Sequence, residues 1–395
     1  MGKKSEEWLS QKRWNPFNSY KLLAHVNRWS QIEYGRIIPP PMLITVDPAN
    51  TCNFDCAWCN AKYVREHRNF MLTSKILGDI ARFLPRWGAG YGYKEPGVKA
   101  ICIAGGGEPL LNRATPSFIE QVRGGGIEVG VVTNGSFVGE CIEALSQCTW
   151  VGVSVDSGTA ETLNKLKGLE PSRMEFRKII DNIANLVDYS SSRGAQLGKP
   201  HPSYGVSYKY LLYKENIGEV YKAAKLAKEI GCKNIHYRPA GTTWNNVDEG
   251  NQIIFTEEDI DLFNEQIIKA QELDDESFGV FGVTHKFDSQ FGISNMFKAC
   301  HAIFMTAVIS PPLTKESPRD SFVLGLCCDR RGDPALELLR DCLDVDEIER
   351  VWGREKHWDI HDAIRVAHCP RCTYQPHNQI YEQVIRNDSM TYKFI

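Results

Sequence analysis

Residues 42–60 read MLITVDPANTCNFDCAWCN, an apolar run followed directly by a segment with three cysteines. The apolar run ends before Pro48, and Cys52, Cys56 and Cys59 lie within eight positions of one another. Thiols spaced so closely indicate metal ligation, because thiolates are soft ligands that suit zinc and iron. A closed tetrahedral site needs four ligands, so this segment alone predicts a metal site with one position left open.

Length and composition set the broad class of protein. The chain has 395 residues, and a single hydrophobic core stops growing at roughly 250–300 residues, so we expect one large unit and a smaller one. Apolar residues make up 42% and charged residues 24%, which is ordinary for a globular protein. The formal net charge of −3 gives no general attraction to nucleic acid.

The sequence shows no membrane-spanning or secretory segment. No stretch approaches the roughly 20 apolar residues that a spanning helix requires. The N-terminus, MGKKSEEWLSQKRW, is charged and lacks the apolar core of a signal peptide. We therefore expect a cytoplasmic protein with no membrane or nucleic-acid partner. In a reducing compartment, 13 cysteines indicate metal ligands rather than a disulfide framework.

Strand-like and helical stretches alternate along the first two thirds of the chain. Apolar runs typical of strands occupy 42–47, 98–104, 127–133, 150–156, 203–213 and 234–239. Helical periodicity fills 72–84, 115–122, 138–146, 172–188 and 217–230. This alternation predicts an α/β fold in which helices cover a parallel sheet, with an open or partial (β/α)6 barrel as the natural architecture.

The chain divides into four expected parts. A helical lead-in, with a helix around 19–30, spans 1–41 and ends at a run of three prolines. The partial barrel spans 42–240, and a connection with a helix around 257–272 spans 241–298. The last part, 299–395, is expected to be a separate, smaller cysteine-rich unit that ends in a helix.

The residues most suited to chemistry follow the expected strands. The three-cysteine segment follows the first strand, and the glycine-rich run that ends at Pro109 follows the second. Thr133 and Asn134 end the third strand, and Asp156 ends the fourth. Active sites of such barrels lie on the loops after the carboxyl ends of the strands. These segments therefore share one rim.

The spacing C-x3-C-x2-C, with Trp58 before the last thiol and GGEP at 106–109, resembles the radical S-adenosylmethionine (SAM) superfamily over residues 42–240. The resemblance implies a [4Fe–4S] cluster held by the three cysteines, whose unligated iron binds the amino and carboxylate groups of SAM. An electron from the reduced cluster then yields methionine and a 5′-deoxyadenosyl radical, which abstracts hydrogen from a substrate. A low-potential electron donor such as flavodoxin or ferredoxin is implied as well.

The resemblance also places the SAM contacts. It implies that the glycines of the GGEP run approach the methionine amino group, that the end of the third strand lies near SAM, and that the end of the fourth contacts the ribose. The implied contacts are Trp58, Gly106, Gly107, Glu108, Pro109, Thr133, Asn134, Ser154 and Asp156. The alternative is a structural zinc site, which would leave the glycine-rich rim and the repeated βα units without a role.

A second set of cysteines lies near the C-terminus. The order of these cysteines along the chain resembles the SPASM extension or its shorter form, twitch. The resemblance implies one auxiliary [4Fe–4S] cluster. The candidate ligands are Cys300, Cys327, Cys328, Cys369 and Cys372. A zinc site built from the last four of these is the alternative. Cys342 is a spare thiol, a ligand or a hydrogen-atom donor. The remaining cysteines are expected to be buried packing groups, namely Cys102, Cys141, Cys148 and Cys232.

The substrate is the least defined part of the prediction. An auxiliary cluster in this family permits oxidation or epimerisation, and 41 residues are too few for a peptide-leader domain ahead of the barrel, which favours a small polar substrate such as a sugar or aminocyclitol. Peptide modification is the alternative, followed by a non-catalytic iron–sulfur or zinc scaffold. Candidate substrate contacts or catalytic groups are Lys209, Tyr213, His236 and Arg238. If His236 and Arg238 point inward, Tyr237 faces the helices.

Overall fold

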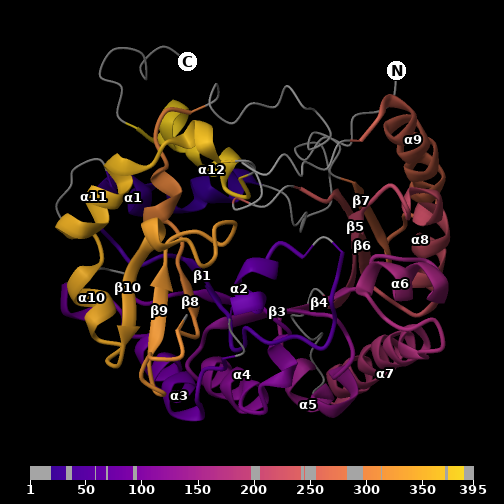
Figure 1. Ribbon diagram of the computed structural model, residues 1–395, viewed down its shortest axis with the longest axis horizontal. Helices are drawn as coiled ribbons and strands as arrows, with labels where there is room; N and C mark the ends of the chain where they lie inside the picture. Colours follow the sequence, from indigo (N-terminus) through magenta and orange to yellow (C-terminus); the bar gives the residue numbers. More distant parts are fainter. Residues whose placement is uncertain are drawn as a thin grey trace.

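The computed structural model describes residues 19–32, 38–57, 59–67, 70–91, 96–196, 205–241, 244, 255–282, 297–312, 314–369 and 372–386. Within these residues one ten-stranded sheet runs through the molecule in the order β10-β9-β8-β1-β2-β3-β4-β5-β6-β7 (Figure 1). Strands β1 to β7 are parallel to one another. The sheet is not closed, because β10 and β7 form its two edges. The expected α/β fold with a partial barrel is confirmed.

The six expected strands are all present, five with slightly shorter bounds and β6 with the expected ones. They are β1 (Leu43–Val46), β2 (Ala100–Ile103), β3 (Glu128–Thr133), β4 (Trp150–Ser154), β5 (Gly205–Leu212) and β6 (Asn234–Pro239). A seventh strand, β7 (Gly279–Gly282), pairs with β6 inside the region expected to be a helical connection. Its four residues are too few to show strand periodicity in the sequence.

Helices cover the outer face of the parallel strands and form an arc around them (Figure 1). They are α3 (Ser74–Phe83), α4 (Thr115–Gly124), α5 (Ile142–Leu145), α6 (Ala160–Lys167), α7 (Glu175–Gln196), α8 (Val220–Glu229) and α9 (Glu257–Gln271). Helix α3 buries Ile76, Ile80 and Phe83 completely, and Thr73 caps its first turn. Helix α6 has no counterpart in the sequence prediction, because eight residues give little periodicity.

The core lies between the sheet and these helices. Alternate residues on each strand face the helices and are apolar, such as Ile44, Ile101, Val129 and Val151, each at most 3% exposed. The intervening residues face the other side of the sheet, which we call the inner face. Polar and titratable side chains such as Lys209 gather there, so the helices contribute stability and the inner face is available for function.

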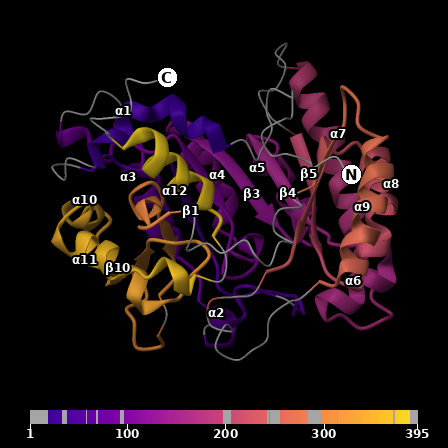
Figure 2. The ribbon, with the colours of Figure 1, turned by 90° about the horizontal axis from the view of Figure 1, so that it is seen from above.

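The remaining elements lie at both ends of the chain. They are α1 (Val26–Trp29), α2 (Lys62–His67), β8 (Val308–Ser310), β9 (Phe322–Gly325), β10 (Glu337–Cys342), α10 (Glu347–Val351), α11 (Glu355–Ala363) and α12 (Gln375–Ile380). The expected helix near residues 19–30 is a 3-10 helix, Ser19–His25, followed by α1. Helices α10 and α11 lie at the opposite end of the molecule from α8 and α9 (Figure 2).

The C-terminal strands extend the sheet of the barrel. Strand β8 runs parallel to β1, with Thr45 opposite Val308 and Val46 opposite Ile309, and β9 and β10 follow in antiparallel order. The C-terminal region was expected to be a separate unit. In the structure, its strand β8 shares backbone hydrogen bonds with β1, the first barrel strand. The four-part division of the chain stays a prediction.

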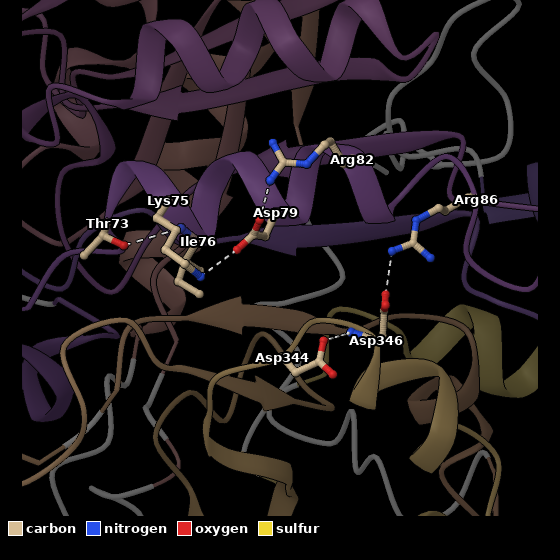
Figure 3. A network of polar contacts seen from close by, with 8 residues as sticks. All are labelled: Thr73, Lys75, Ile76, Asp79, Arg82, Arg86, Asp344 and Asp346. Atoms are coloured by element: carbon tan, nitrogen blue, oxygen red, sulfur yellow. Dashed lines mark hydrogen bonds and ion pairs between the residues drawn. The ribbon is translucent and has the colours of Figure 1, made fainter.

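Side chains also join the C-terminal region to the segment after α3 (Figure 3). Arg86 Nη2 donates to Asp346 Oδ1 at 2.5 Å, and the amide of Gly88 donates to Glu349 Oε1 at 3.0 Å. The rings of Trp87 and Trp352 meet edge to face with 5.1 Å between their centres. The apolar ring contact is buried, whereas the Arg86–Asp346 pair is exposed, so we expect the rings to contribute most of the free energy.

A buried ion pair makes a third connection. Arg331, in the turn after β9, donates from Nε to Asp47 Oδ2 at 2.6 Å and from Nη1 to the carbonyl of Cys328 at 2.6 Å. Asp47 follows β1 and is fully buried. Beside this carboxylate the pKa of the Arg331 guanidinium is raised despite its burial. The pair therefore ties the second cysteine region to the end of β1.

Asp47→Asn tests this connection. It leaves the buried Arg331 charge without its carboxylate, and breaking one side of a buried pair costs about 3 kcal/mol or more. We expect a clear fall in the free energy of unfolding, measured by urea denaturation. The matched change at the exposed pair, Asp346→Asn, should cost less than about 1 kcal/mol. Equal losses in the two variants would contradict the assigned role of the buried pair.

Candidate active site

The first cysteine segment belongs to a closed loop that follows β1 and includes α2. An isolated bridge between Ala49 and Met71 closes its base, and the amide of Asn50 donates to the carbonyl of Phe70 at 2.8 Å. Cys52, Cys56 and Cys59 lie on this loop and are half-buried. The loop therefore presents its three thiols from a base that backbone hydrogen bonds hold at the end of β1.

The carboxyl end of α6 holds the middle of this loop. The amide of Asp55 donates to the carbonyl of Lys167 at 3.0 Å, and the amide of Ala57 donates to that of Leu166 at 2.9 Å. Gly168 ends the helix with a φ of 64°, and a Cβ there would lie 2.6 Å from the Asp55 carbonyl. Two backbone carbonyls at the end of α6 have no hydrogen-bond donor within the helix. They thus accept hydrogen bonds from the cysteine loop.

Two cations flank the thiols. Arg65 donates from Nη1 to the carbonyl of Phe54 at 2.5 Å and from Nη2 to Asp55 Oδ1 at 3.0 Å. The Lys167 ammonium pairs with the buried carboxylate of Asp156. Burial raises the pKa of the Cys56 thiol to about 11, and the Lys167 charge opposes that shift. Thiolates that bind a metal are negative, so nearby cations favour the ligating form.

The glycine run after β2 packs against the start of the same loop. A Cβ at Gly107 would lie 2.0 Å from the Thr51 carbonyl, and one at Gly106 would lie 2.5 Å from Asn50 Oδ1. The amide of Glu108 donates to the Thr51 carbonyl at 2.8 Å. These glycines are therefore required by contact with the cysteine loop itself. Their predicted approach to the methionine amino group of SAM stays a prediction.

Glu108 organises the end of β3. Its buried carboxylate accepts hydrogen bonds from Thr133 Oγ1 at 2.7 Å, from the amide of Asn134 at 2.7 Å and from the amide of Leu110 at 3.1 Å. Burial raises the pKa of Glu108 to about 7, and these donors oppose the shift. Pro109 begins the short 3-10 turn that follows. Glu108 thereby fixes the segment that carries Asn134 beside the cysteines.

Asn134 completes the connection to the thiols. Its Nδ2 donates to Asn53 Oδ1 at 2.8 Å and lies 3.9 Å from the sulfur of Cys52. Asn53 in turn donates to Ser136 Oγ at 3.1 Å. The structure thus brings together the cysteine loop, the GGEP run and the end of β3, as their expected positions on one rim require.

The two predicted ribose contacts differ in their surroundings. Ser154 is half-buried at the end of β4. Asp156 is buried with a φ of 62°, and its Oδ1 accepts from the amide of Leu211 at 2.7 Å while Lys167 engages the other oxygen. The Asp156 carboxylate therefore joins β4, β5 and α6. A ribose role for either residue stays a prediction, and Trp58 lies outside the described residues.

The second cysteine set comes together from three segments. Cys300, Cys369 and Cys372 pack with Phe297 and Val366 in one apolar cluster. Burial raises the pKa of the Cys327 thiol well above its ordinary value, and the charges that raise it further include those of Cys328, Cys300 and Cys372. These four thiols form a group, which fits the soft, four-ligand donor set of one further cluster.

Cys328 and Cys342 have different neighbours. Cys328 influences the pKa of Cys102 and of Arg331, on the inner face of the sheet. Cys342 ends β10, and its sulfur donates to the carbonyl of Asp344 at 3.2 Å. Cys342 therefore lies apart from the group of four, whereas Cys328 adjoins Cys327 and raises the pKa of its thiol. The ligand roles of both thiols stay predictions.

No three cysteine, histidine or acidic side chains of the described residues lie close enough together to hold a single metal ion. A four-iron cube carries its irons at separate corners, so its thiolate ligands are further apart than the ligands of one ion. The fit to a cluster rests on the chemistry of the donors. Three thiols beside two cations are suitable ligands for an iron–sulfur cluster with one open iron.

The candidate substrate residues lie at the second half of the sheet. Lys209 Nζ lies 2.8 Å from His236 Nδ1, and Arg238 follows two positions later on the same strand face. Burial, together with the nearby charge of Arg238, lowers the pKa of Lys209 to about 7. Tyr213, by contrast, is buried against Leu166.

Two expectations about neighbouring residues can be compared with the structure. Tyr237 faces the helices, as expected, and its hydroxyl donates to the Val220 carbonyl at 2.6 Å. Cys102 was expected to be a buried packing group and is instead half-buried on β2, where burial raises the pKa of its thiol and the charges of Arg331 and Lys209 oppose that shift. In the sequence Cys102 has apolar neighbours on both sides. These do not indicate that alternate residues of β2 face inward. Cys141, Cys148 and Cys232 are buried, as expected.

The fold and the site are those of an α/β domain that presents three thiols on a loop after its first strand. The radical SAM superfamily model matches residues 46–194. Residues 46–194 therefore form a radical SAM domain, whose cofactors are a [4Fe–4S] cluster and SAM. No helix of the described residues has the length and apolar character needed to cross a membrane.

Two curated proteins resemble part of the chain. A probable GTP 3′,8-cyclase of Metallosphaera sedula is 23% identical over 206 residues, which are 51% of this chain and 56% of that protein. An S-adenosylmethionine-dependent nucleotide dehydratase of Lacinutrix mariniflava is 26% identical over 170 residues, which are 38% of this chain and 34% of that protein. The chain thus spans about half of the first relative and a third of the second.

Solved structures resemble the chain over most of its length. SuiB of Streptococcus suis, bound to the precursor peptide SuiA, has a TM-score of 0.58 at 16% identity and covers 94% of this chain and 80% of that one. The enzyme anSMEcpe, with bound AdoMet and a peptide, has a TM-score of 0.55 at 16% identity and covers 86% of this chain and 88% of that one. At these identities the likeness shows the fold.

Gly107→Ala tests the contact between the glycine run and the cysteine loop. The new Cβ would meet the Thr51 carbonyl at 2.0 Å, so the loop has to shift. We expect a lower iron content after anaerobic reconstitution, measured by iron analysis and by visible absorption. The control is Gly124→Ala at the end of α4, where a Cβ would meet nothing within 4 Å. Unchanged iron binding by Gly107→Ala would contradict the assigned contact.

Proposed function

We propose that this chain is a radical SAM enzyme that abstracts hydrogen from a small polar substrate, with one auxiliary [4Fe–4S] cluster in its C-terminal region. The observation that carries this proposal is the cysteine loop, which the glycine run and the end of α6 hold beside Asn134. When bound, the first cluster would supply the electron that cleaves SAM into methionine and a 5′-deoxyadenosyl radical.

The residues of the chain have distinct tasks in this reaction. Cys52, Cys56 and Cys59 hold the cluster, while Arg65 and Lys167 offset the negative charge of the thiolates. Glu108 keeps the end of β3 in position through the hydroxyl of Thr133 and the amide of Asn134. We assign contacts with SAM to this rim and contacts with the substrate to the inner face of the sheet.

The C-terminal thiols support the auxiliary cluster. Cys300, Cys327, Cys369 and Cys372 are the proposed ligands, because Cys300, Cys369 and Cys372 pack in one cluster and the charges of Cys300 and Cys372 reach Cys327. Asn378 Nδ2 lies 3.9 Å from the Cys300 sulfur, where an N–H group can stabilise a thiolate. An auxiliary cluster that accepts an electron from a substrate radical would permit oxidation of the substrate. Epimerisation is the alternative outcome at the same site.

The comparisons favour two kinds of substrate. The two curated relatives are named for reactions of nucleotides, which supports a small polar substrate. The solved structures of SuiB and anSMEcpe contain peptides, which supports peptide modification as the second candidate function. We also propose a low-potential electron donor such as flavodoxin or ferredoxin, because cleavage of SAM consumes one electron. The proposed location is the cytoplasm.

Replacement of Cys52, Cys56 and Cys59 by alanine tests the catalytic assignment. Anaerobically reconstituted wild-type protein should bind about eight iron atoms, as two four-iron cubes require, and should form 5′-deoxyadenosine from SAM and dithionite. The triple variant should bind about four and form none. Cys148→Ala, which alters a buried thiol on the helix side, is the control. Continued formation of 5′-deoxyadenosine by the triple variant would refute the proposal.

Cys372→Ala tests the auxiliary cluster separately. It removes one of the four grouped thiols, so iron content should fall by up to half while the first site stays loaded. Iron analysis and electron paramagnetic resonance of the reduced protein distinguish the two sites. Cys342→Ala is the control, since this thiol lies apart at the end of β10. Zinc in place of iron at the second site, found by metal analysis, would favour the zinc alternative.

A further inference from the structure

Hydrogen-bond donors adjoin the thiols of the second cysteine group. Asn378, on α12, is fully buried and directs its Nδ2 at the sulfur of Cys300, 3.9 Å away. The Oδ1 of the same carboxamide accepts from the amide of Ala302 at 2.8 Å, so the orientation of the Asn378 side chain is fixed. The amide of Tyr374 hydrogen-bonds to the thiol of Cys372. Two of the four grouped thiols therefore have an N–H donor that a neighbouring segment holds in place.

A guanidinium lies beside a third thiol of this group. Arg330, in the turn after β9, pairs with the buried carboxylate of Asp333 three positions further on. Asp333 also caps the 3-10 turn Pro334–Leu336, so the guanidinium is anchored to the backbone that follows it. Burial raises the pKa of the Cys369 thiol, and the charge of Arg330 and its hydrogen bond to this thiol oppose that shift. Arg330 therefore supplies a charged donor to Cys369.

One N–H group of this guanidinium has no acceptor within the described part of the chain. The Nε atom of Arg330 is buried there without a hydrogen-bond partner. A buried donor without an acceptor costs free energy, so such a group calls for an explanation, and an ion that the site holds is one. The sulfides of an iron–sulfur cluster accept hydrogen bonds from the surrounding protein. The free Nε–H of Arg330 thus fits a cluster held by the neighbouring thiols.

An acidic side chain also lies near these thiols. The charge of Asp329 acts on Cys369 with the opposite sign to that of Arg330. Its carboxylate accepts hydrogen bonds from the amide of Thr373 at 2.6 Å and from the Thr373 hydroxyl at 3.0 Å. These bonds join the turn after β9 to the segment that follows Cys372. Asp329 therefore holds the two segments together, whereas Arg330 presents N–H groups to sulfur.

We propose that Arg330 and Asn378 raise the reduction potential of the auxiliary cluster through N–H···S hydrogen bonds, so that it can accept an electron from the substrate radical. The inference rests on the proposed function, because it requires the second cluster. An added electron makes the cluster more negative, and N–H donors and a nearby cation stabilise that state. In the proposed oxidation the substrate radical gives one electron to the cluster and one proton to water. Epimerisation leaves no electron on the cluster, so these donors favour oxidation.

The reduction potential of the second site tests this inference. The iron-loaded full-length protein is titrated anaerobically with dithionite in the presence of mediator dyes, and electron paramagnetic resonance follows the reduced clusters. The signal that persists when the three cysteines of the first loop are replaced by alanine identifies the second site. Arg330→Met should make reduction of this site about tenfold less favourable, which is a negative shift of about 59 mV for one electron. Arg330→Lys keeps the charge and should retain most of the potential.

Asn378→Leu removes the N–H group beside Cys300 and should shift the potential in the same direction, so the test does not depend on one variant. Arg350→Met is the matched control, because Arg350 is exposed on α10 and forms an ion pair with a carboxylate three positions away, as Arg330 does. An unchanged potential in this control, with negative shifts in Arg330→Met and Asn378→Leu, supports the inference.

Equal potentials in wild type, Arg330→Met and Asn378→Leu would overturn the inference while leaving the proposed function intact. Loss of the second cluster from both variants would also overturn it, because these residues would then hold the site rather than set its potential. The iron content of the wild type is measured separately. A wild type that holds the first cluster alone would contradict the proposed auxiliary cluster, and the inference with it.

Discussion

Contact between the Gly107 backbone and the Thr51 carbonyl constrains the whole candidate site. A side chain at residue 107 would occupy the place of that carbonyl. On its other side the cysteine loop is held by the last carbonyls of α6. A loop fixed from both sides can present three thiols without a fourth protein ligand, and this leaves one coordination position of a cluster for a small molecule. The carboxylates of Glu108 and Asp156 then join this loop to β3, β4 and β5.

Much of the barrel could be predicted from the sequence, because its strands follow simple physical patterns. Runs such as 127–133 are apolar over most of their length, and a parallel sheet covered by helices demands such runs. Alternation also predicted that Tyr237 faces the helices, where its hydroxyl reaches the Val220 carbonyl. The rim residues could be placed because the carboxyl ends of parallel strands lie at one edge.

Other features depend on contacts between segments that lie far apart in the chain. The short helix α6 has little periodicity, yet its end carries Lys167 and the carbonyls that hold the cysteine loop. Arg331 is one charged residue among many in the sequence, and only the fold brings it to Asp47, 284 positions away. Cys102 has apolar neighbours on both sides, so its inward orientation could be inferred only once the register of β2 was known. Strand β7 is likewise defined by its partner, β6.

Strand β1 lies between β2 and β8, so it connects the two halves of the sheet. If the chain were cut before β8, the remaining barrel would expose the unpaired amides and carbonyls of β1 along one edge, and unpaired edges promote aggregation. The isolated C-terminal piece would present the matching edge of β8. Separation of the two halves would therefore give each of them an unpaired edge strand that the intact sheet does not have.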